Sequence, residues 1–179
     1  MEQKHIYQLN VLGMFGIASV LFAGIFFQFA LDELPCPLCL LQRVGFALVL
    51  FGFALNVRFG IRQRHYGIVL MGALFGAVSA LRQVSLHVIP GTPHYGSDVM
   101  GMHYYTWAFV IFGLTILGVS VLNLLWQEKW KEGTDTMTKI GKYCMWFAIA
   151  SVFLNFVLTF AECGPYECAA DPVKYWLFN

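Results

Sequence analysis

Charge is what this sequence has least of. Only 12% of its 179 residues are charged, whereas 59% are hydrophobic. A typical soluble domain carries about 25% charged residues and about 45–50% apolar ones. So few charges would leave large apolar patches on a soluble globule of 20.2 kDa. The composition therefore argues against a soluble enzyme, a disordered chain and a coiled coil, and it indicates a membrane protein.

The sequence also lacks an excess of either charge, because its formal net charge is +1 at pH 7. Proteins that bind nucleic acids carry a basic surface that neutralises phosphates, so this balance argues against nucleic acid as a partner. No internal repeat, low-complexity tract or second soluble domain interrupts the sequence. We therefore expect residues 1–179 to form a single polytopic domain whose surroundings are the lipid bilayer.

Long uncharged runs predict the membrane-spanning segments. A helix needs about 20 mostly apolar residues to cross the bilayer. Five stretches meet this requirement, so we predict an all-α integral membrane fold, a four-helix transmembrane bundle joined by a fifth transmembrane helix. The predicted spans are residues 10–31, 39–57, 66–88, 104–126 and 142–161, followed by a tail at residues 162–179.

The basic residues predict which side of the membrane each end faces. Short loops rich in Lys and Arg stay in the cytoplasm. This rule places the N-terminus in the cytoplasm and, after an odd number of spans, the C-terminus in the periplasm. The first span is longer than the apolar core of a signal peptide and no small-residue cleavage site follows it, so we expect a retained anchor. Eight of the eleven basic residues belong to the cytoplasmic set: Lys4, Arg58, Arg62, Arg64, Lys129, Lys131, Lys139 and Lys142.

Four of the five cysteines fall on the outer side in this topology. Cys36 and Cys39 form a Cys-Pro-Leu-Cys motif before the second span, whereas Cys163 and Cys168 lie in the tail. We expect Cys144, at the cytoplasmic start of the last span, to be a small buried apolar side chain. Disulfides persist in oxidising compartments and are rare in the cytoplasm, so two outer pairs and one inner thiol agree with the predicted sidedness.

The motif at residues 36–39 has the features of a reactive pair. Pro37 suits the first position of a helix, which puts Cys36 near the N-cap and Cys39 in the first turn. The unpaired N–H groups and the dipole at a helix N-terminus stabilise a thiolate. Arg43 follows Cys39 by four residues on the same helical face, so its cation would stabilise that thiolate further. An arginine within a span is costly, which predicts a functional role for Arg43.

Structural interpretations of these cysteines stay open on the sequence. The Cys36/Cys39 pair could form a static disulfide, or both pairs could ligate one zinc ion, although an oxidising compartment disfavours four free thiolates. A glycine–proline step between the two tail cysteines predicts a turn that lets them approach. Taken alone, the tail pair is as consistent with a structural clip as with a redox role. Two pairs on one side of the membrane favour exchange between them.

The segment at residues 34–43 reads Leu-Pro-Cys-Pro-Leu-Cys-Leu-Leu-Gln-Arg. It resembles the Pro-Cys-x-x-Cys-x3-Arg signature of the DsbB family, membrane proteins that make disulfides using quinone. Looser similarities, which extend over about the first four helices, are Arg82-x4-His87 and Gly101-x5-Trp107.

The resemblance implies a thiol:quinone oxidoreductase of the bacterial inner membrane. In that case Cys36 and Cys39 are the redox pair, Cys39 contacts the quinone ring, and Arg43 is the cation on the cofactor side. The implied cofactor is a membrane quinone, ubiquinone or menaquinone, and the implied partner is a periplasmic DsbA-like protein with a thioredoxin fold. We expect His87 to bind near the cofactor and donate protons, a role also open to His94 and His103 in the same outer loop.

The sequence departs from the family pattern in its second cysteine pair. Typical members have four helices and carry that pair between helices three and four, but residues 87–103 contain no cysteine. We expect Cys163 and Cys168 to take the role. A partner thiolate would attack their disulfide, and the reduced pair would then attack the disulfide of Cys36 and Cys39.

Two other function classes remain open on the sequence. A membrane enzyme that resembles the vitamin K epoxide reductases would run electrons in the reductive direction, but those enzymes carry the active motif late in their bundle. A non-enzymatic membrane subunit would use its disulfides only to brace outer loops. Arg43 and Arg82 are the charges expected at depth, and no charged pairs or broken helices mark a transport path.

Overall fold

The structure, a computed structural model, describes the chain except for residues 1, 89–90, 92–94, 133–136, 171 and 179. His94 therefore lies outside the described residues. Five helices in the described part are long and apolar enough to cross a membrane, which confirms the predicted all-helical membrane architecture. They are α1 (Gln3–Ala30), α2 (Pro37–Phe59), α3 (Gln63–His87), α4 (Tyr104–Leu124) and α5 (Lys139–Cys163).

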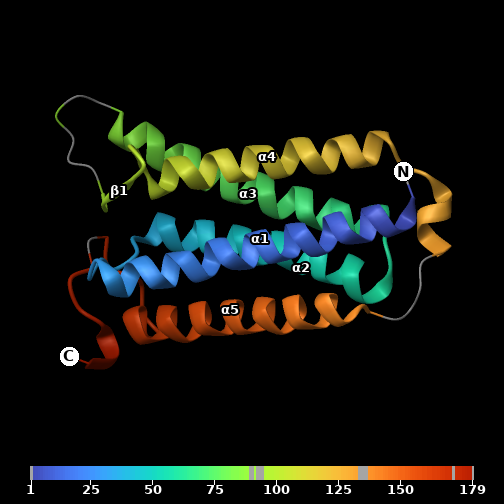
Figure 1. Cartoon of the computed structure of the whole chain (residues 1–179). Coiled ribbons are helices and arrows are strands. Elements are labelled where there is room, and N and C mark those ends of the chain that lie inside the picture. Colours follow the sequence, from blue (N-terminus) through green and yellow to red (C-terminus); the bar gives the residue numbers. More distant parts are fainter. Residues whose placement is uncertain (1, 89–90, 92–94, 133–136, 171, 179) are drawn as a thin grey trace.

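The helices pack in a series. α2 packs against α1 and α3, α3 also packs against α4, and α5 lies along α1 and α2. α4 and α5 thus lie on opposite sides of the bundle (Figure 1). Large apolar side chains on the outer faces are exposed, for example Leu12, Met71, Leu114 and Phe156, as expected where lipid replaces water.

Glycines bring three of the helices into close contact. A Cβ atom on Gly45 of α2 would lie 2.7 Å from the Cα of Gly76 on α3, and a Cβ on Gly76 would overlap the ring of Phe112. The Phe112 ring of α4 stacks on Phe46 of α2 with 4.0 Å between ring centroids. Small residues therefore set the spacing of α2, α3 and α4, as is common between membrane helices.

The loop between α3 and α4 contains a short β-hairpin, which the sequence analysis did not predict. Strand β1 (Asp98–Val99) pairs antiparallel with β2 (Met102–His103). The two turn residues, Met100 and Gly101, have φ values of 53° and 79°. Positive φ at both central residues is the geometry of a tight hairpin turn that matches the strand twist.

Nine of the ten helix ends differ from the expected spans, and two of these differences bear on the site or are large. α1 begins at Gln3, well before residue 10, because helix continues beyond the apolar run. α5 continues through Cys163, so Glu162 and Cys163 belong to the helix and not to the tail. Gly164 ends α5 with a φ of 62°, a conformation that favours glycine. Two short 3-10 helices complete the described elements. η1 (Glu128–Glu132) follows α4, and η2 (Trp176–Phe178) lies in the C-terminal tail.

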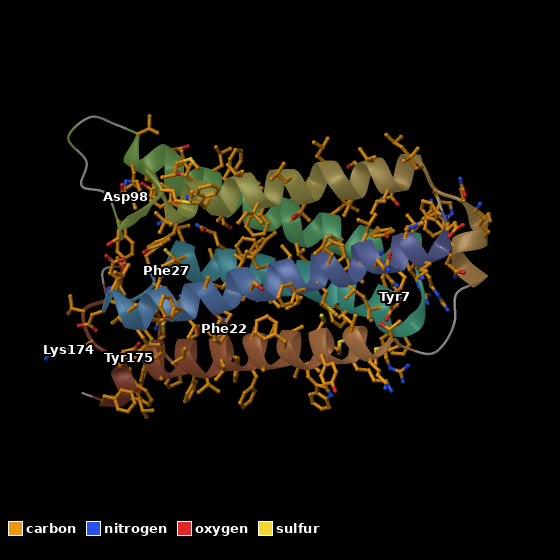
Figure 2. All side chains as sticks on the ribbon, in the orientation of Figure 1. Tyr7, Phe22, Phe27, Asp98, Lys174 and Tyr175 are labelled. Atoms are coloured by element: carbon orange, nitrogen blue, oxygen red, sulfur yellow. A yellow bond between two sulfur atoms is a disulfide. The ribbon has the colours of Figure 1, made fainter. Side chains whose placement is uncertain are left out.

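The two ends of the bundle differ in composition. The N-terminus and the starts of α3 and α5 lie at one end, whereas the hairpin and the C-terminus lie at the other (Figure 1). Tyr7 marks the first end, and Lys174 and Tyr175 mark the second (Figure 2). The basic set named above falls on the first end, in the first turns of α1, α3 and α5, at the N-cap of α3, in the last turn of α2 and in η1. The sidedness of the two ends stays a prediction.

Candidate active site

Cys36 and Cys39 lie at the start of α2, where the sequence predicts them. Cys36 is the N-cap, Pro37 begins the helix, and the Cys36 Sγ accepts a hydrogen bond from the Cys39 backbone N–H at 3.2 Å. Both are free thiols, Cys36 buried and Cys39 half-buried. The hydrogen bond with the Cys39 side chain, and then burial, raise the pKa of the Cys36 thiol. Cys36 is therefore the protonated member of the pair, and Cys39 is the candidate thiolate.

A buried glutamine from α3 joins the two sulfurs. The Gln83 side chain is 1% exposed, and its Nε2 lies 3.3 Å from the Cys36 Sγ and 3.5 Å from the Cys39 Sγ as a hydrogen-bond donor. The Gln83 Oε1 accepts a 2.7 Å hydrogen bond from Gln42 Nε2 on α2, which fixes the amide orientation. N–H groups aimed at a sulfur favour its charged form. Gln83 thus supplies the polar contact that the helix start cannot supply alone.

The Arg43 side chain is held by two residues of α1. Its position within α2 agrees with the sequence, which places this cation inside a span. Its Nη1 donates to Gln28 Oε1 at 3.0 Å, and its Nη2 donates to the Gly24 carbonyl at 3.2 Å. Gln28 in turn donates from Nε2 to the Tyr175 hydroxyl in the C-terminal tail at 2.9 Å. These bonds orient the guanidinium, and Arg43 interacts electrostatically with Cys39.

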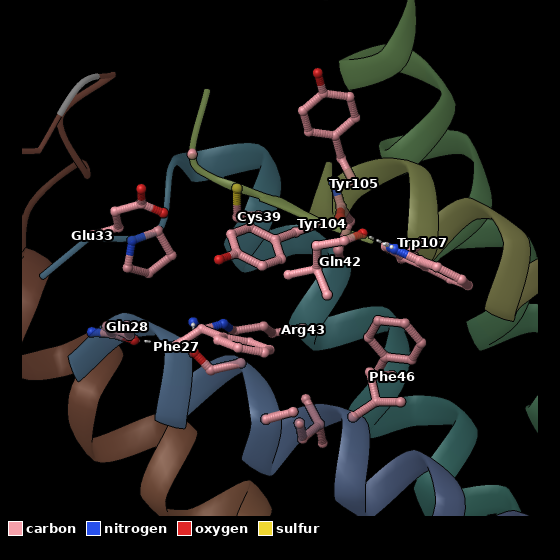
Figure 3. Close-up of a pocket in the computed structure, with 18 of the residues that line it drawn as sticks. Phe27, Gln28, Glu33, Cys39, Gln42, Arg43, Phe46, Tyr104, Tyr105 and Trp107 are labelled. Carbon is pink, nitrogen blue, oxygen red and sulfur yellow. Dashed lines mark hydrogen bonds between the residues drawn. The ribbon is translucent and has the colours of Figure 1, made fainter. Parts of the chain in front are cut away.

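A cavity of about 390 Å³ lies beside Cys39 and Arg43. Its walls are mostly apolar and come from several helices, with a few polar groups that converge on one side (Figure 3). Such a lining is typical of sites for small organic ligands and cofactors, whose volumes begin at about 300 Å³. The aromatic lining residues are Phe27, Phe46, Tyr95, Tyr104, Tyr105 and Trp107, and the polar ones include Gln28, Cys39, Gln42, Arg43 and Gln83.

The hairpin loop covers the outer side of this cavity. Glu33, just before α2, accepts hydrogen bonds from the Ser97 backbone N–H at 3.0 Å and from the Ser97 hydroxyl at 2.6 Å. The Tyr95 hydroxyl donates to the Leu34 carbonyl at 2.6 Å, and Trp107 Nε1 donates to the Val99 carbonyl at 2.9 Å. The loop is thus tied both to the segment that carries the cysteines and to α4.

His87, the last residue of α3, and His103, in β2, both contact an aromatic residue that lines the cavity. His87 Nδ1 donates to the Gln83 carbonyl at 2.7 Å, and the His87 ring stacks on Tyr105 with 5.2 Å between centroids. The His103 ring stacks on the same tyrosine at 5.3 Å. Tyr105 lines the cavity, whereas neither histidine is among its lining residues. Arg82 is exposed on α3 and is also outside the lining, which is consistent with a long side chain that extends from the span to the membrane interface.

Cys163 and Cys168 form a disulfide across the end of α5. Cys163 is 8% exposed, and Gly164 lies under the Trp176 ring, where an added Cβ would be 2.6 Å from the ring. In the described residues no hydrogen bond or disulfide joins this pair to Cys36 or Cys39. The start of α2, which carries the first pair, and the end of α5, which carries Cys163, lie at the same end of the bundle (Figure 1).

The structure therefore brings together Cys36, Cys39 and Arg43, and it adds residues that the sequence analysis missed. Within the described part of the chain, no group of three or more potential ligands could hold a metal ion, so the zinc alternative gains no support. For three of the missed residues, Gln28, Gln42 and Gln83, the signal is a neutral amide within an apolar span, since such groups need partners in lipid. The missed residues are Gln28, Gln42, Gln83, Glu162 and Tyr175.

Comparison with known proteins gives a consistent result. The family described as disulfide bond formation protein DsbB matches residues 7–95. Disulfide bond formation protein B of Stutzerimonas stutzeri is 32% identical over 88 residues, 46% of this chain and 53% of the relative. The same protein of Nitrosomonas eutropha is 32% identical over 77 residues, 41% of this chain and 48% of the relative. That of Chromobacterium violaceum is 38% identical over 71 residues, 37% of this chain and 43% of the relative.

No solved structure matches the chain. The chain spans about half the length of the curated relatives it matches, 43–53% of each. The matched residues 7–95 include Cys36, Cys39, Arg43 and Gln83, whereas α4, α5 and the tail disulfide lie beyond them. On the family match and these relatives, the chain belongs to the DsbB family of disulfide bond formation proteins.

Proposed function

We propose that this protein is a thiol:quinone oxidoreductase of the bacterial inner membrane. It oxidises a periplasmic dithiol protein with a thioredoxin fold, similar to DsbA, and passes the electrons to the membrane quinone pool. The observation that carries the proposal is the cavity of about 390 Å³ lined by both Cys39 and Arg43. A redox-active sulfur and a cation at one apolar cavity are what a thiol:quinone reaction needs.

The residues present fit a quinone, either ubiquinone or menaquinone. The cavity has an aromatic and aliphatic wall for a ring, and Arg43 offers a charged donor to a carbonyl oxygen. When bound, a quinone accepts two electrons and two protons, which matches what two thiols lose when they form a disulfide. Membership of the DsbB family supports this assignment.

The two cysteines of the first pair have different roles in the proposed reaction. Cys39 lines the cavity and interacts electrostatically with Arg43, so it is the sulfur on the cofactor side. Cys36 is 6% exposed and does not line the cavity, so it closes the disulfide with Cys39. Gln83 donates hydrogen bonds to both sulfurs and so holds them close to each other. Attack requires a thiolate, and a stabilised Cys39 thiolate is also a good leaving group.

Cys163 and Cys168 are the proposed entry point for electrons. A partner thiolate attacks their disulfide and leaves oxidised, and the reduced pair then attacks the disulfide of Cys36 and Cys39. His87 is a proposed proton donor near the cavity, because its ring stacks on Tyr105, which lines the cavity. Cys163 is buried and Cys168 is partly exposed, so Cys168 is the sulfur that a partner thiolate can reach, with Cys163 as the leaving thiolate.

Quinone reduction by the purified protein tests the proposal. The full-length protein in lipid and detergent is mixed with a reduced DsbA-like protein and ubiquinone or menaquinone, and quinone absorbance is followed. We expect reduction with wild-type protein and none with Cys36→Ala or Cys39→Ala. Cys144→Ala, which removes the thiol outside both pairs, is the matched control and should retain the activity. Absence of quinone reduction by wild-type protein would refute the proposed function.

The double variant Cys163→Ala/Cys168→Ala tests the entry point separately. We expect it to lose oxidation of the partner protein while still oxidising a small dithiol such as dithiothreitol, because the first pair and the cavity are unchanged. If this variant oxidises the partner at the wild-type rate, the tail pair is a structural clip and the partner meets Cys36 and Cys39 directly.

A further inference from the structure

Glu162, in the last turn of α5, is an acidic side chain that is buried without a hydrogen-bond partner in the described residues. It is 5% exposed, and neither carboxylate oxygen has a hydrogen-bond partner within the described residues. It is also the one acidic residue among the buried side chains of the described part of the chain. A charged group left unpaired in a low-dielectric interior is costly. In a membrane span such a residue indicates a function more often than a structural role.

Its surroundings connect Glu162 to the cysteine site. The groups that interact electrostatically with Glu162 are Arg43 and Cys39, both on α2. Asn155 of α5 donates to the Leu21 carbonyl of α1 at 3.3 Å, and Glu162 and Gln28 each lie seven residues further along, so they are level on two helices that run in the same direction (Figure 1). Gln28 is hydrogen-bonded to Tyr175 of the tail, which also interacts with Arg43. Helix α5 packs against α1, α2 and η2 at this end.

Arg43 interacts electrostatically with both acidic groups, the Glu162 carboxyl and the Cys39 thiol. Its guanidinium donates to two neutral oxygens, Gln28 Oε1 and the Gly24 carbonyl, so none of its described hydrogen bonds is to an anion. Its positive charge is therefore shared between the Glu162 carboxylate and a Cys39 thiolate. An ionised Glu162 opposes the thiolate both directly, as a like charge, and by neutralising Arg43. Removal of that negative charge leaves Arg43 to Cys39 alone.

We propose that Glu162 is a positioning residue that sets the pH range in which Cys39 reacts, by dividing the charge of Arg43 between α5 and the cysteine pair. The inference rests on the proposed function and deepens it, because it assigns α5 a role at the site. This helix lies outside the residues that match the family, so the role belongs to this chain's own C-terminal part.

Alkylation of Cys39 tests the inference without any quinone. In a Cys36→Ala/Cys144→Ala background with the tail disulfide intact, Cys39 is the free thiol, and its rate of reaction with iodoacetamide is measured from pH 5 to 10. We expect Glu162→Gln to move the midpoint of this profile about half a pH unit or more toward acid, the size of effect that one nearby charge exerts in a protein. Glu167→Gln, on the exposed part of the tail, is the matched control and should leave the midpoint unchanged.

Glu162→Asp separates charge from packing. This variant keeps the carboxylate, so its profile should stay close to the wild-type profile while that of Glu162→Gln shifts. Equal shifts in both variants, or no shift in either, would overturn the inference. Thermal unfolding of each variant identifies any that fails to fold, and if Glu162→Gln is one of them, Glu162→Leu, which also removes the charge, takes its place. If wild-type protein reduces no quinone but the Gln variant shifts the profile, the proposed function fails and the electrostatic link stands.

Discussion

Gln83 is the residue on which the geometry of the cysteine pair depends most. It is buried, it donates to both sulfurs, and it is oriented by Gln42 from the same helix that carries the cysteines. A neutral amide can stabilise a developing thiolate without adding a second buried charge. The contact joins α3 to the start of α2, so the reactive pair depends on tertiary packing as well as on its own helix.

Replacement of Gln83 by Leu should impair both stability and reactivity. The change removes the N–H donors to the sulfurs and leaves the Gln42 amide without its acceptor, at a cost of about 1–3 kcal/mol. Thermal or denaturant unfolding should report this loss, and alkylation of Cys39 at neutral pH should slow several-fold. Ser85→Ala, on the exposed face of the same helix, is the control. Wild-type alkylation in the Leu variant would contradict the role.

The two thiols should differ in their response to pH. Because hydrogen bonding with Cys39 and burial raise the pKa of Cys36 above its ordinary value of 9.0, Cys36 stays protonated where an unfolded thiol would ionise. Its contribution to stability is therefore present below pH 9 and is lost as pH rises through the higher folded value. A short iodoacetamide pulse at pH 8, read by mass spectrometry, should label Cys39 before Cys36. Equal labelling is expected after denaturation, and faster labelling of native Cys36 would contradict the assignment.

The hairpin loop is the element that covers the outer side of the cavity. Val99 and Met100 line the cavity, and the loop is tied to the segment before α2 through Glu33 and Ser97. Because these bonds lie at the outer rim, they can open locally without unfolding the bundle. We expect the loop to open when the cavity exchanges its occupant.

Glu33→Ala should loosen this loop and leave the helices intact. It removes both hydrogen bonds to Ser97, and the loss of about 1.4 kcal/mol corresponds to about tenfold faster exchange of the backbone amides at residues 95–103. Hydrogen–deuterium exchange by mass spectrometry measures this directly. Asp32→Asn, at the exposed neighbouring position, is the control. Unchanged protection of the loop in the Ala variant would show that other contacts hold it.

The candidate redox residues lie at one end of the helix bundle, and most of the basic residues lie at the other. Cysteine pairs, Arg43, the hairpin and the tail gather at the end where α1 and α5 finish. Buried polar side chains tie the helices together at the opposite end, where Asn10 donates to the Tyr66 hydroxyl at 2.7 Å and Asn56 donates to Asn10 at 2.9 Å. This polarity agrees with a protein that reacts on one side of a membrane.

Reporter fusions test the predicted sidedness. Alkaline phosphatase fused after residue 179 should be active, because that end is predicted to be periplasmic. A fusion after residue 127, before α5, should be inactive, since the chain has then returned to the cytoplasmic side. The reverse pattern would invert the topology, and activity at neither site would mean that α5 does not cross the membrane.

Much of the fold could be predicted from the sequence because apolar runs and charge gaps are local signals. Five long apolar helices, a cysteine pair at the start of α2 and Arg43 one turn later all follow from residues close in the chain. The helix ends were less accurate, since α5 continues through Cys163 until Gly164 stops it. The hairpin was missed because its two short strands carry too few residues for an alternating pattern.

The sequence by itself determined the membrane class, the reactive motif and the cation beside it, since each rests on residue type and short spacing. Only the tertiary structure decided which distant side chains surround them. Gln83 is 44 residues from Cys39, and the hydroxyl of Tyr175 reaches Gln28 across 147 residues. The burial of Glu162 likewise depends on how α5 packs against α1 and α2. Such partners leave no periodic pattern, because a single buried polar contact depends on the relative position of whole helices.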